Sequence, residues 1–99
     1  MKIRPVQKGS NDGHPDFMFW CPGCKCGHGV WTTSSSISGG VWEFNGDVDK
    51  PTFSPSILVR HHEWTVEKVC HSFVRDGKIE FLNDCTHELA GKTVPMEDF

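Results

Sequence analysis

The stretch 69–88, VCHSFVRDGKIEFLNDCTHE, constrains the fold of this 99-residue chain more than any other. Asp76-Gly77 stands between two arms rich in β-branched and aromatic residues. Such a pair favours a two-residue type I′ turn, in which both residues have a positive φ. The turn predicts a β-hairpin with four facing pairs: Arg75 with Lys78, Val74 with Ile79, Ser72 with Phe81, and Cys70 with Asn83. Because side chains alternate between the faces of a strand, Cys70 and Cys85 share one face, roughly 7–8 Å apart by backbone. We therefore expect the hairpin to bring two thiols together.

The other segments are short, and turn residues separate them. Apolar and β-prone runs predict strands at 1–8, 16–20, 30–33, 41–44, 52–59 and 92–94, with a polar loop or short strand at 60–65. Pro51 and Pro55 favour an edge position for the first half of 52–59, since proline cannot donate to a sheet ladder. No segment keeps a helical period for more than two turns. The sequence predicts one mostly-β domain over 1–99, a small zinc-ribbon-like fold of short antiparallel strands and hairpins with long loops. Within it, 34–40 (SSSISGG) is expected to be a flexible loop.

A second pair of thiols stands in the run CPGC, between a predicted strand and a Gly-rich return. Two residues between the thiols let the backbone curl so that both sulfurs face one ion. Together with the hairpin thiols, this pair predicts a tetrahedral Zn²⁺ site formed by Cys21, Cys24, Cys70 and Cys85. His28 and His87 are candidate substitutes for one of these thiols. Cys26 follows Cys24 so closely that we expect it to point elsewhere.

Two other interpretations of the thiols stay open. Cys70 and Cys85 are of a type that often packs as a small apolar side chain. Alternatively, Trp20 followed by CPGC resembles a redox dithiol. That chemistry needs a helix N-terminus behind the first cysteine, and the following run KCGHGVW predicts no helix. Zinc binding is therefore preferred over both.

The opposite face of the predicted hairpin carries His71 and Asp84. In a regular strand His71 points away from Cys70, so the two cannot bind the same ion. With Ser54 and Ser56, these residues form a candidate polar groove. The alternative is that all four are hydrogen-bonded structural residues.

Three blocks of the chain carry a resemblance: FWCPGCKCGH, PTFSPSILV and CHSFVRDGKIEFLNDCTHELAGKTV, which span 19–94. They resemble a family of small phage and bacterial proteins, often labelled as domains of unknown function or as ammonia monooxygenase. The resemblance implies shared positions at Cys21, Cys24, His28, Cys70, His71, Cys85 and His87, with Cys26 an addition of this sequence. Some bacterial relatives are encoded beside ubiquitin-like conjugation genes, which implies a role in protein handling. The resemblance implies no particular activity.

Charge and composition narrow the classes of function. The net charge is −3 and the basic residues are scattered, which disfavours a nucleic-acid surface. The chain has neither an apolar run of about 18 residues nor a signal-peptide pattern, so we expect a cytoplasmic protein, in the host cell if phage-encoded, with no membrane partner. Five cysteines in a reducing compartment favour metal binding over disulfides. The first functional hypothesis is a zinc-stabilised accessory module that binds a host or phage protein. The alternatives are a zinc-dependent hydrolase with an open metal site and, third, a single-stranded nucleic-acid binder.

Overall fold

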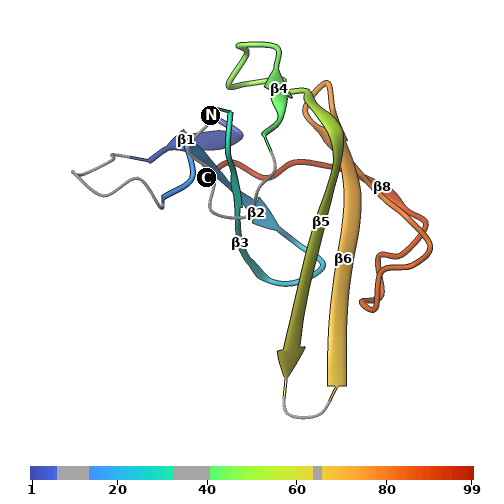
Figure 1. The fold of residues 1–99 in the computed structure, drawn as a ribbon. Coiled ribbons are helices and arrows are strands. Elements are labelled where there is room, and N and C mark those ends of the chain that lie inside the picture. Colours follow the sequence, from blue (N-terminus) through green and yellow to red (C-terminus); the bar gives the residue numbers. More distant parts are fainter. Residues whose placement is uncertain (7–13, 33–40, 64–65) are drawn as a thin grey trace.

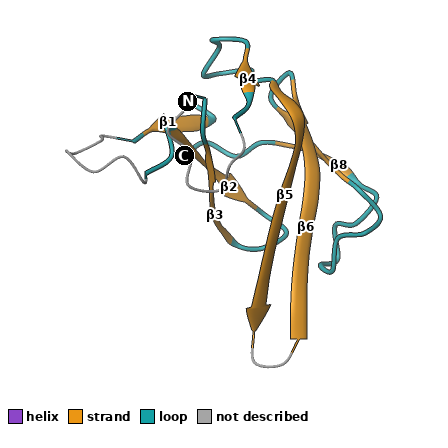
Figure 2. Cartoon of the chain, viewed as in Figure 1, coloured by secondary structure: helices purple, strands orange, loops and turns teal. Residues whose placement is uncertain are grey.

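The chain folds into two antiparallel β-sheets. The structure, a computed structural model, describes residues 1–6, 14–32, 41–63 and 66–99, and within these ranges it contains strands and no helix (Figures 1 and 2). One sheet has the order β1-β2-β3, with bounds Ile3–Pro5, Phe17–Cys21 and Cys26–Val30. The other has the order β4-β5-β6-β7-β8, with bounds Glu43–Phe44, Phe53–Glu63, Val66–Arg75, Lys78–Phe81 and Thr93–Pro95. The mostly-β prediction is confirmed, whereas the finer likeness to a zinc ribbon is not shown. None of the described ranges holds a helix that is long and apolar enough to cross a membrane.

The hairpin of β6 and β7 has the predicted turn and the predicted register near the turn. Asp76 and Gly77 have φ values of 50° and 75°, as a type I′ turn requires. Arg75 pairs with Lys78, Val74 with Ile79, and Ser72 with Phe81. The predicted pair of Cys70 and Asn83 is wrong because β7 ends at Phe81 and the chain then turns. The N–H of Cys85 donates to the carbonyl of Leu82 at 3.2 Å within that turn.

Two further predictions differ from the structure. The strand expected at 30–33 lies earlier, at Cys26–Val30, because Lys25 has a φ of 58° and completes a tight turn directly after the CPGC run. Gly27 and Gly29 then pair with β2, and a Cβ on Gly29 would lie 2.8 Å from the ring of Pro15, so close packing requires the glycine. The second difference lies at 60–65, predicted as a polar loop or a separate short strand, where β5 instead continues without a break to Glu63. The loop predicted at 34–40 lies outside the described residues.

The core lies between the two sheets and contains side chains from both. Phe17 of the first sheet contacts Phe44 of the second, with ring centroids 4.9 Å apart, and Phe44 stacks on Phe53 at 5.0 Å. The buried members of the core are Ile3, Phe19, Cys21, Val30, Phe53, Ile57, Cys70, Val74, Ile79, Phe81, Cys85 and Met96. Because Cys70 points into this core, the next residue along β6, His71, points to the outer face of the second sheet.

Strand β5 is irregular near its start. Phe53 pairs with Val74 and Ile57 pairs with Ser72, so the three residues 54–56 of β5 stand opposite the single residue Phe73 of β6. Such bulges bend a strand and re-aim side chains, and they occur often beside active sites. Pro55 lies within the irregular segment, where a missing N–H costs no ladder hydrogen bond.

Candidate functional site

A serine, a histidine and an aspartate form a continuous hydrogen-bonded chain on the outer face of the second sheet. Ser56 Oγ lies 2.9 Å from His71 Nε2. The other ring nitrogen, Nδ1, lies 3.0 Å from Asp84 Oδ2. Three of the four residues of the predicted polar groove therefore lie together.

The fourth residue, Ser54, lies apart from this chain. It is exposed, pairs with Glu43 of β4, and lines a different shallow pocket beside Phe44 and Thr52. The bulge of β5 explains the difference between the two serines, since it breaks the simple alternation that would have placed them on one face.

Each member of the hydrogen-bonded chain comes from a different structural element. Ser56 ends the irregular segment of β5, His71 lies in the middle of β6, and Asp84 lies in the turn after β7. The side chain of His71 is 25% exposed and that of Asp84 55% exposed, so the chain of groups is open to solvent at the carboxylate end. The site thus combines β5, β6 and the turn that follows β7.

The identities of the three groups determine where the protons lie. An ionised carboxylate only accepts hydrogen bonds, so His71 Nδ1–H donates to Asp84. In the neutral ring Nε2 then has no proton and accepts from the hydroxyl of Ser56. A hydroxyl that donates to an imidazole whose other nitrogen is oriented by a carboxylate is the arrangement of an activated nucleophile.

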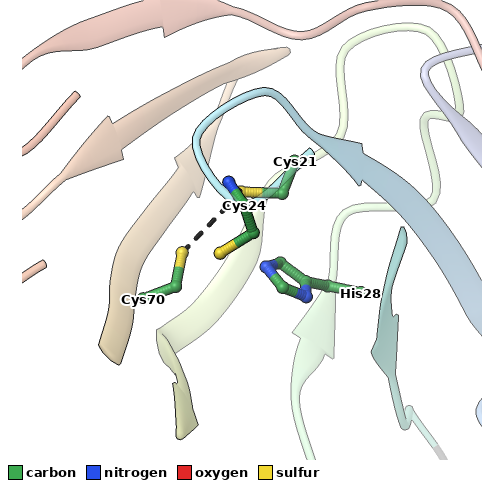
Figure 3. Close-up of side chains that lie close together, drawn as sticks. All are labelled: Cys21, Cys24, His28 and Cys70. Carbon is green, nitrogen blue, oxygen red and sulfur yellow. Dashed lines mark hydrogen bonds between the residues drawn. The ribbon is translucent and has the colours of Figure 1, made fainter. Parts of the chain in front are cut away.

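A second cluster lies on the buried side of the same strand. It consists of Cys21, Cys24, His28 and Cys70, whose ligand atoms all lie within 4.8 Å of one another. Figure 3 shows the three sulfurs and the imidazole of His28 directed toward one another. Cys21 ends β2, Cys24 lies in the turn after it, and His28 lies in β3, whereas Cys70 comes from β6 of the other sheet. An ion held here would connect the two sheets.

This donor set fits a tetrahedral metal ion. Two sulfurs bound to zinc at about 2.3 Å in a regular tetrahedron are about 3.8 Å apart. The Sγ atoms of Cys21 and Cys70 are separated by 3.8 Å. His28 Nε2 is buried and has no hydrogen-bond partner within the described part of the chain, an arrangement that a metal bond would satisfy.

The protonation of the thiols also fits a cation site. The hydrogen bond from Cys70 lowers the pKa of Cys21 to about 3. Burial raises the pKa of Cys24 to about 12, and the hydrogen bond to Cys21 raises the pKa of Cys70. A divalent ion bound here would favour the thiolate form of all three cysteines.

The site differs from the predicted quartet at Cys85. His28, predicted as a substitute, joins the cluster instead, because the turn after β7 directs Cys85 toward the backbone of His71. Cys85 Sγ accepts from the N–H of His71 and donates to its carbonyl oxygen, each at 3.2 Å. Cys70, Cys85 and His87 form a second, three-membered group within the same 4.8 Å limit. His87 lies against Gly23, where a Cβ would approach the imidazole within 2.3 Å.

The hydrogen-bonded chain and the metal cluster are joined through β6. Cys70 and His71 are consecutive and point to opposite faces of the strand, and the two hydrogen bonds between Cys85 Sγ and the backbone of His71 hold that backbone in place. Cys26 is exposed and lies outside the cluster.

Comparison with known proteins identifies one family. No curated protein and no solved structure matches the chain. The model of the family described as bacterial ubiquitination-like system serine protease (BubE) matches residues 4–82, about four fifths of the chain. The matched range includes Ser56 and His71 and ends two residues before Asp84. The chain belongs to the BubE family of bacterial ubiquitination-like system serine proteases.

Proposed function

We propose that this protein is a serine protease that acts in a bacterial ubiquitination-like system, with Ser56 as nucleophile. His71 is the general base and then the general acid, and Asp84 orients the imidazole. The observation that carries the proposal is the unbroken chain of 2.9 Å and 3.0 Å contacts through the two nitrogens of His71. The family description supports the reaction class independently.

The reaction follows from the donor directions in this chain. The Ser56 hydroxyl proton passes to His71 Nε2 as Oγ bonds to the substrate carbonyl carbon. When the tetrahedral intermediate collapses, the C–N bond breaks and His71 returns the proton to the leaving amine. Water then repeats the sequence on the acyl-enzyme, which releases the acid and restores the serine. Throughout, Asp84 stabilises the imidazolium form of His71.

We further propose that Zn²⁺ occupies the cluster of Cys21, Cys24, His28 and Cys70 as a structural ion. Three thiolates and one imidazole are a common closed zinc set. Four protein ligands complete a tetrahedron, which disfavours the zinc-hydrolase alternative because that alternative needs a metal-bound water. The two sites lie on opposite faces of β6. This separation supports two distinct roles, in which Ser56 carries out the chemistry and the metal stabilises the fold.

Binding to a partner protein, the first functional hypothesis from sequence, becomes part of this proposal, because a protease in a ubiquitination-like system acts on proteins. The family description names a protease and no separate binding role. Cytoplasmic localisation and phage origin stay predictions.

A fluorescent fluorophosphonate tests the proposal, because it labels activated serines without any need for a known substrate. Wild-type protein should be labelled, and peptide mass spectrometry should place the adduct on Ser56. Ser56→Ala and His71→Ala should abolish labelling, in line with the roughly 10⁴- to 10⁶-fold losses seen when triad members are removed. Ser54→Ala is the matched control, since this exposed neighbour lies outside the hydrogen-bonded chain, and it should be labelled like the wild type. Unlabelled wild-type protein, or an adduct on Ser54, would contradict the proposal.

A further inference from the structure

Two strand edges near Ser56 have no partner strand among the described residues. β3 is the last strand of its sheet, because only β2 pairs with it. On the second sheet, β4 pairs with Phe53 and Ser54 alone, so the following part of β5 is bonded to β6 on one side and free on the other. Free edges present a row of unpaired N–H and C=O groups, which readily accept an added strand.

These two edges form the walls of a groove. Its volume is about 360 Å³, within the range of ligand sites. Gly27, Gly29 and Trp31 line one wall, and the run 57–60 of β5 lines the other. The two strands belong to different sheets and do not pair with each other (Figure 1). The groove therefore lies between the two sheets, along the free edge of β5.

Trp42 closes one end of the groove, next to the candidate nucleophile. Its backbone N–H donates to the carbonyl of Trp31 at 2.8 Å, and its indole Nε1–H donates to the carbonyl of Ser56 at 3.2 Å. The chain itself thus bridges the two walls at this point. The next residues, Glu43 and Phe44, continue as β4 antiparallel to β5.

We propose that the substrate polypeptide binds in this groove as an extended strand antiparallel to β5, with the carbonyl of the bond to be cleaved at Ser56. This inference rests on the proposed protease function. An antiparallel strand along 57–60 approaches Ser56 with its C-terminal end, so the residues before the cleaved bond lie in the groove. Because Trp42 and β4 occupy the continuation of that line, the leaving part of the substrate turns out toward solvent.

The chemistry of the walls indicates recognition of the main chain more than of particular side chains. Gly27 and Gly29 present backbone to the groove, since Cβ atoms there would point instead toward Met18 and Pro15. Trp31 Nε1 is buried in the wall and has no hydrogen-bond partner in the described part of the molecule, so a substrate carbonyl would satisfy it. Leu58, 44% exposed and paired with His71, adds an apolar surface beside the site of cleavage.

Peptide aldehydes of different length test this mode of binding. An aldehyde adds reversibly to an activated serine hydroxyl, so it competes with fluorophosphonate labelling. If strand addition supplies affinity, acetyl-tetraalaninal should slow labelling at a roughly tenfold lower concentration than acetylalaninal does. The reason is that each extra backbone hydrogen bond to the strand edge adds a modest amount to the free energy of binding. The tetrapeptide aldehyde with its two middle nitrogens methylated is the matched control, and it should lose most of that gain, since a methylated amide cannot pair with a strand edge.

A second measurement does not depend on a reactive serine. In Ser56→Ala protein, acetyl-tetraalanine amide at millimolar concentration should shift the backbone amide NMR signals of Gly27, Gly29, Leu58 and Arg60, and leave those of Val66 and Lys78 unchanged. If Ser56 is labelled but inhibition does not depend on peptide length, the proposed binding of substrate in the groove is refuted and the proposed protease function is not. A serine that is not labelled would refute the protease function, and the NMR shifts alone would then decide whether the groove binds peptide.

Discussion

Replacing Asp84 with asparagine isolates the contribution of the carboxylate to the hydrogen-bonded chain. The amide is of the same size but donates through its nitrogen, so it favours the tautomer in which His71 Nε2 holds the proton and no longer accepts from Ser56. In buried triads such a change lowers the rate by about 10⁴-fold. Asp84 lies 3.0 Å from Nδ1, but its side chain is 55% exposed. Solvent therefore screens the attraction between the carboxylate and the imidazolium.

The size of the effect follows from that exposure. Two unit charges about 4 Å apart attract by about 1 kcal/mol in water and about 4 kcal/mol at the effective dielectric near a protein surface. For a half-exposed carboxylate we expect about 1–3 kcal/mol, a loss of roughly 5- to 150-fold in rate.

The assay is the second-order rate of fluorophosphonate labelling at neutral pH, with folding checked by circular dichroism. Asp76→Asn is the matched control: it makes the same change in the exposed type I′ turn, where asparagine is equally suitable, and should leave the rate unchanged. A rate for Asp84→Asn within about twofold of the wild type would refute the assignment of Asp84.

Three further predictions concern the metal and the surface. Purified protein should contain one zinc per chain by elemental analysis. His28→Ala should lose it, whereas Cys85→Ser should keep it and slow serine labelling, because Cys85 holds the backbone of His71. Zinc binding at pH 7 should release about two protons, from Cys24 and Cys70, because the pKa values of both thiols are raised. The affinity for zinc should therefore fall as the pH is lowered. Calorimetry in buffers of different ionisation enthalpy measures this proton release. Gel-shift titrations with DNA and RNA at about 0.15 M salt should show no sub-micromolar binding, since the scattered basic residues neutralise few phosphates.

The parts of the fold that follow from local chemistry could be predicted from sequence. The β6–β7 turn follows from the identity of Asp76-Gly77, and the register near it follows from the turn. Cys21 and Cys24 likewise lie together because two intervening residues force the backbone to curl. The position of Cys85 could not be predicted in this way. Its predicted position assumed that β7 continues past Phe81, whereas tertiary hydrogen bonds after Phe81 turn the chain.

The site residues that depend on long-range pairing could be grouped into one groove, but their direct contacts could not be predicted. Ser56 and Ser54 were equivalent candidates, because the alternation of a regular strand gives both the same face. Only the irregular pairing of β5 with β6, in which 54–56 stand opposite Phe73, separates them. The pairing of β5 with β6 also depends on packing across the whole sheet, so the sequence could place Ser56 and His71 in one groove but could not predict a hydrogen bond between them. The fourth member of the candidate metal cluster, His28, required the same kind of information, since its place in the cluster depends on how the two sheets pack.

The placement of the two sites on one strand has a mechanical consequence. A triad works only when its groups stay within a fraction of an ångström of their positions, which requires rigid support. A domain of about 100 residues buries a smaller fraction of its surface than larger domains do, and its margin of stability is small. The Sγ atom of Cys70 lies within 4.8 Å of those of Cys21 and Cys24, so a metal at this cluster would hold β6 against the other sheet at the residue next to His71. The same alternation that directs Cys70 inward directs His71 outward. A metal bond made in the core would therefore restrain His71, the proposed catalytic base, without occupying either of its hydrogen-bonding nitrogens.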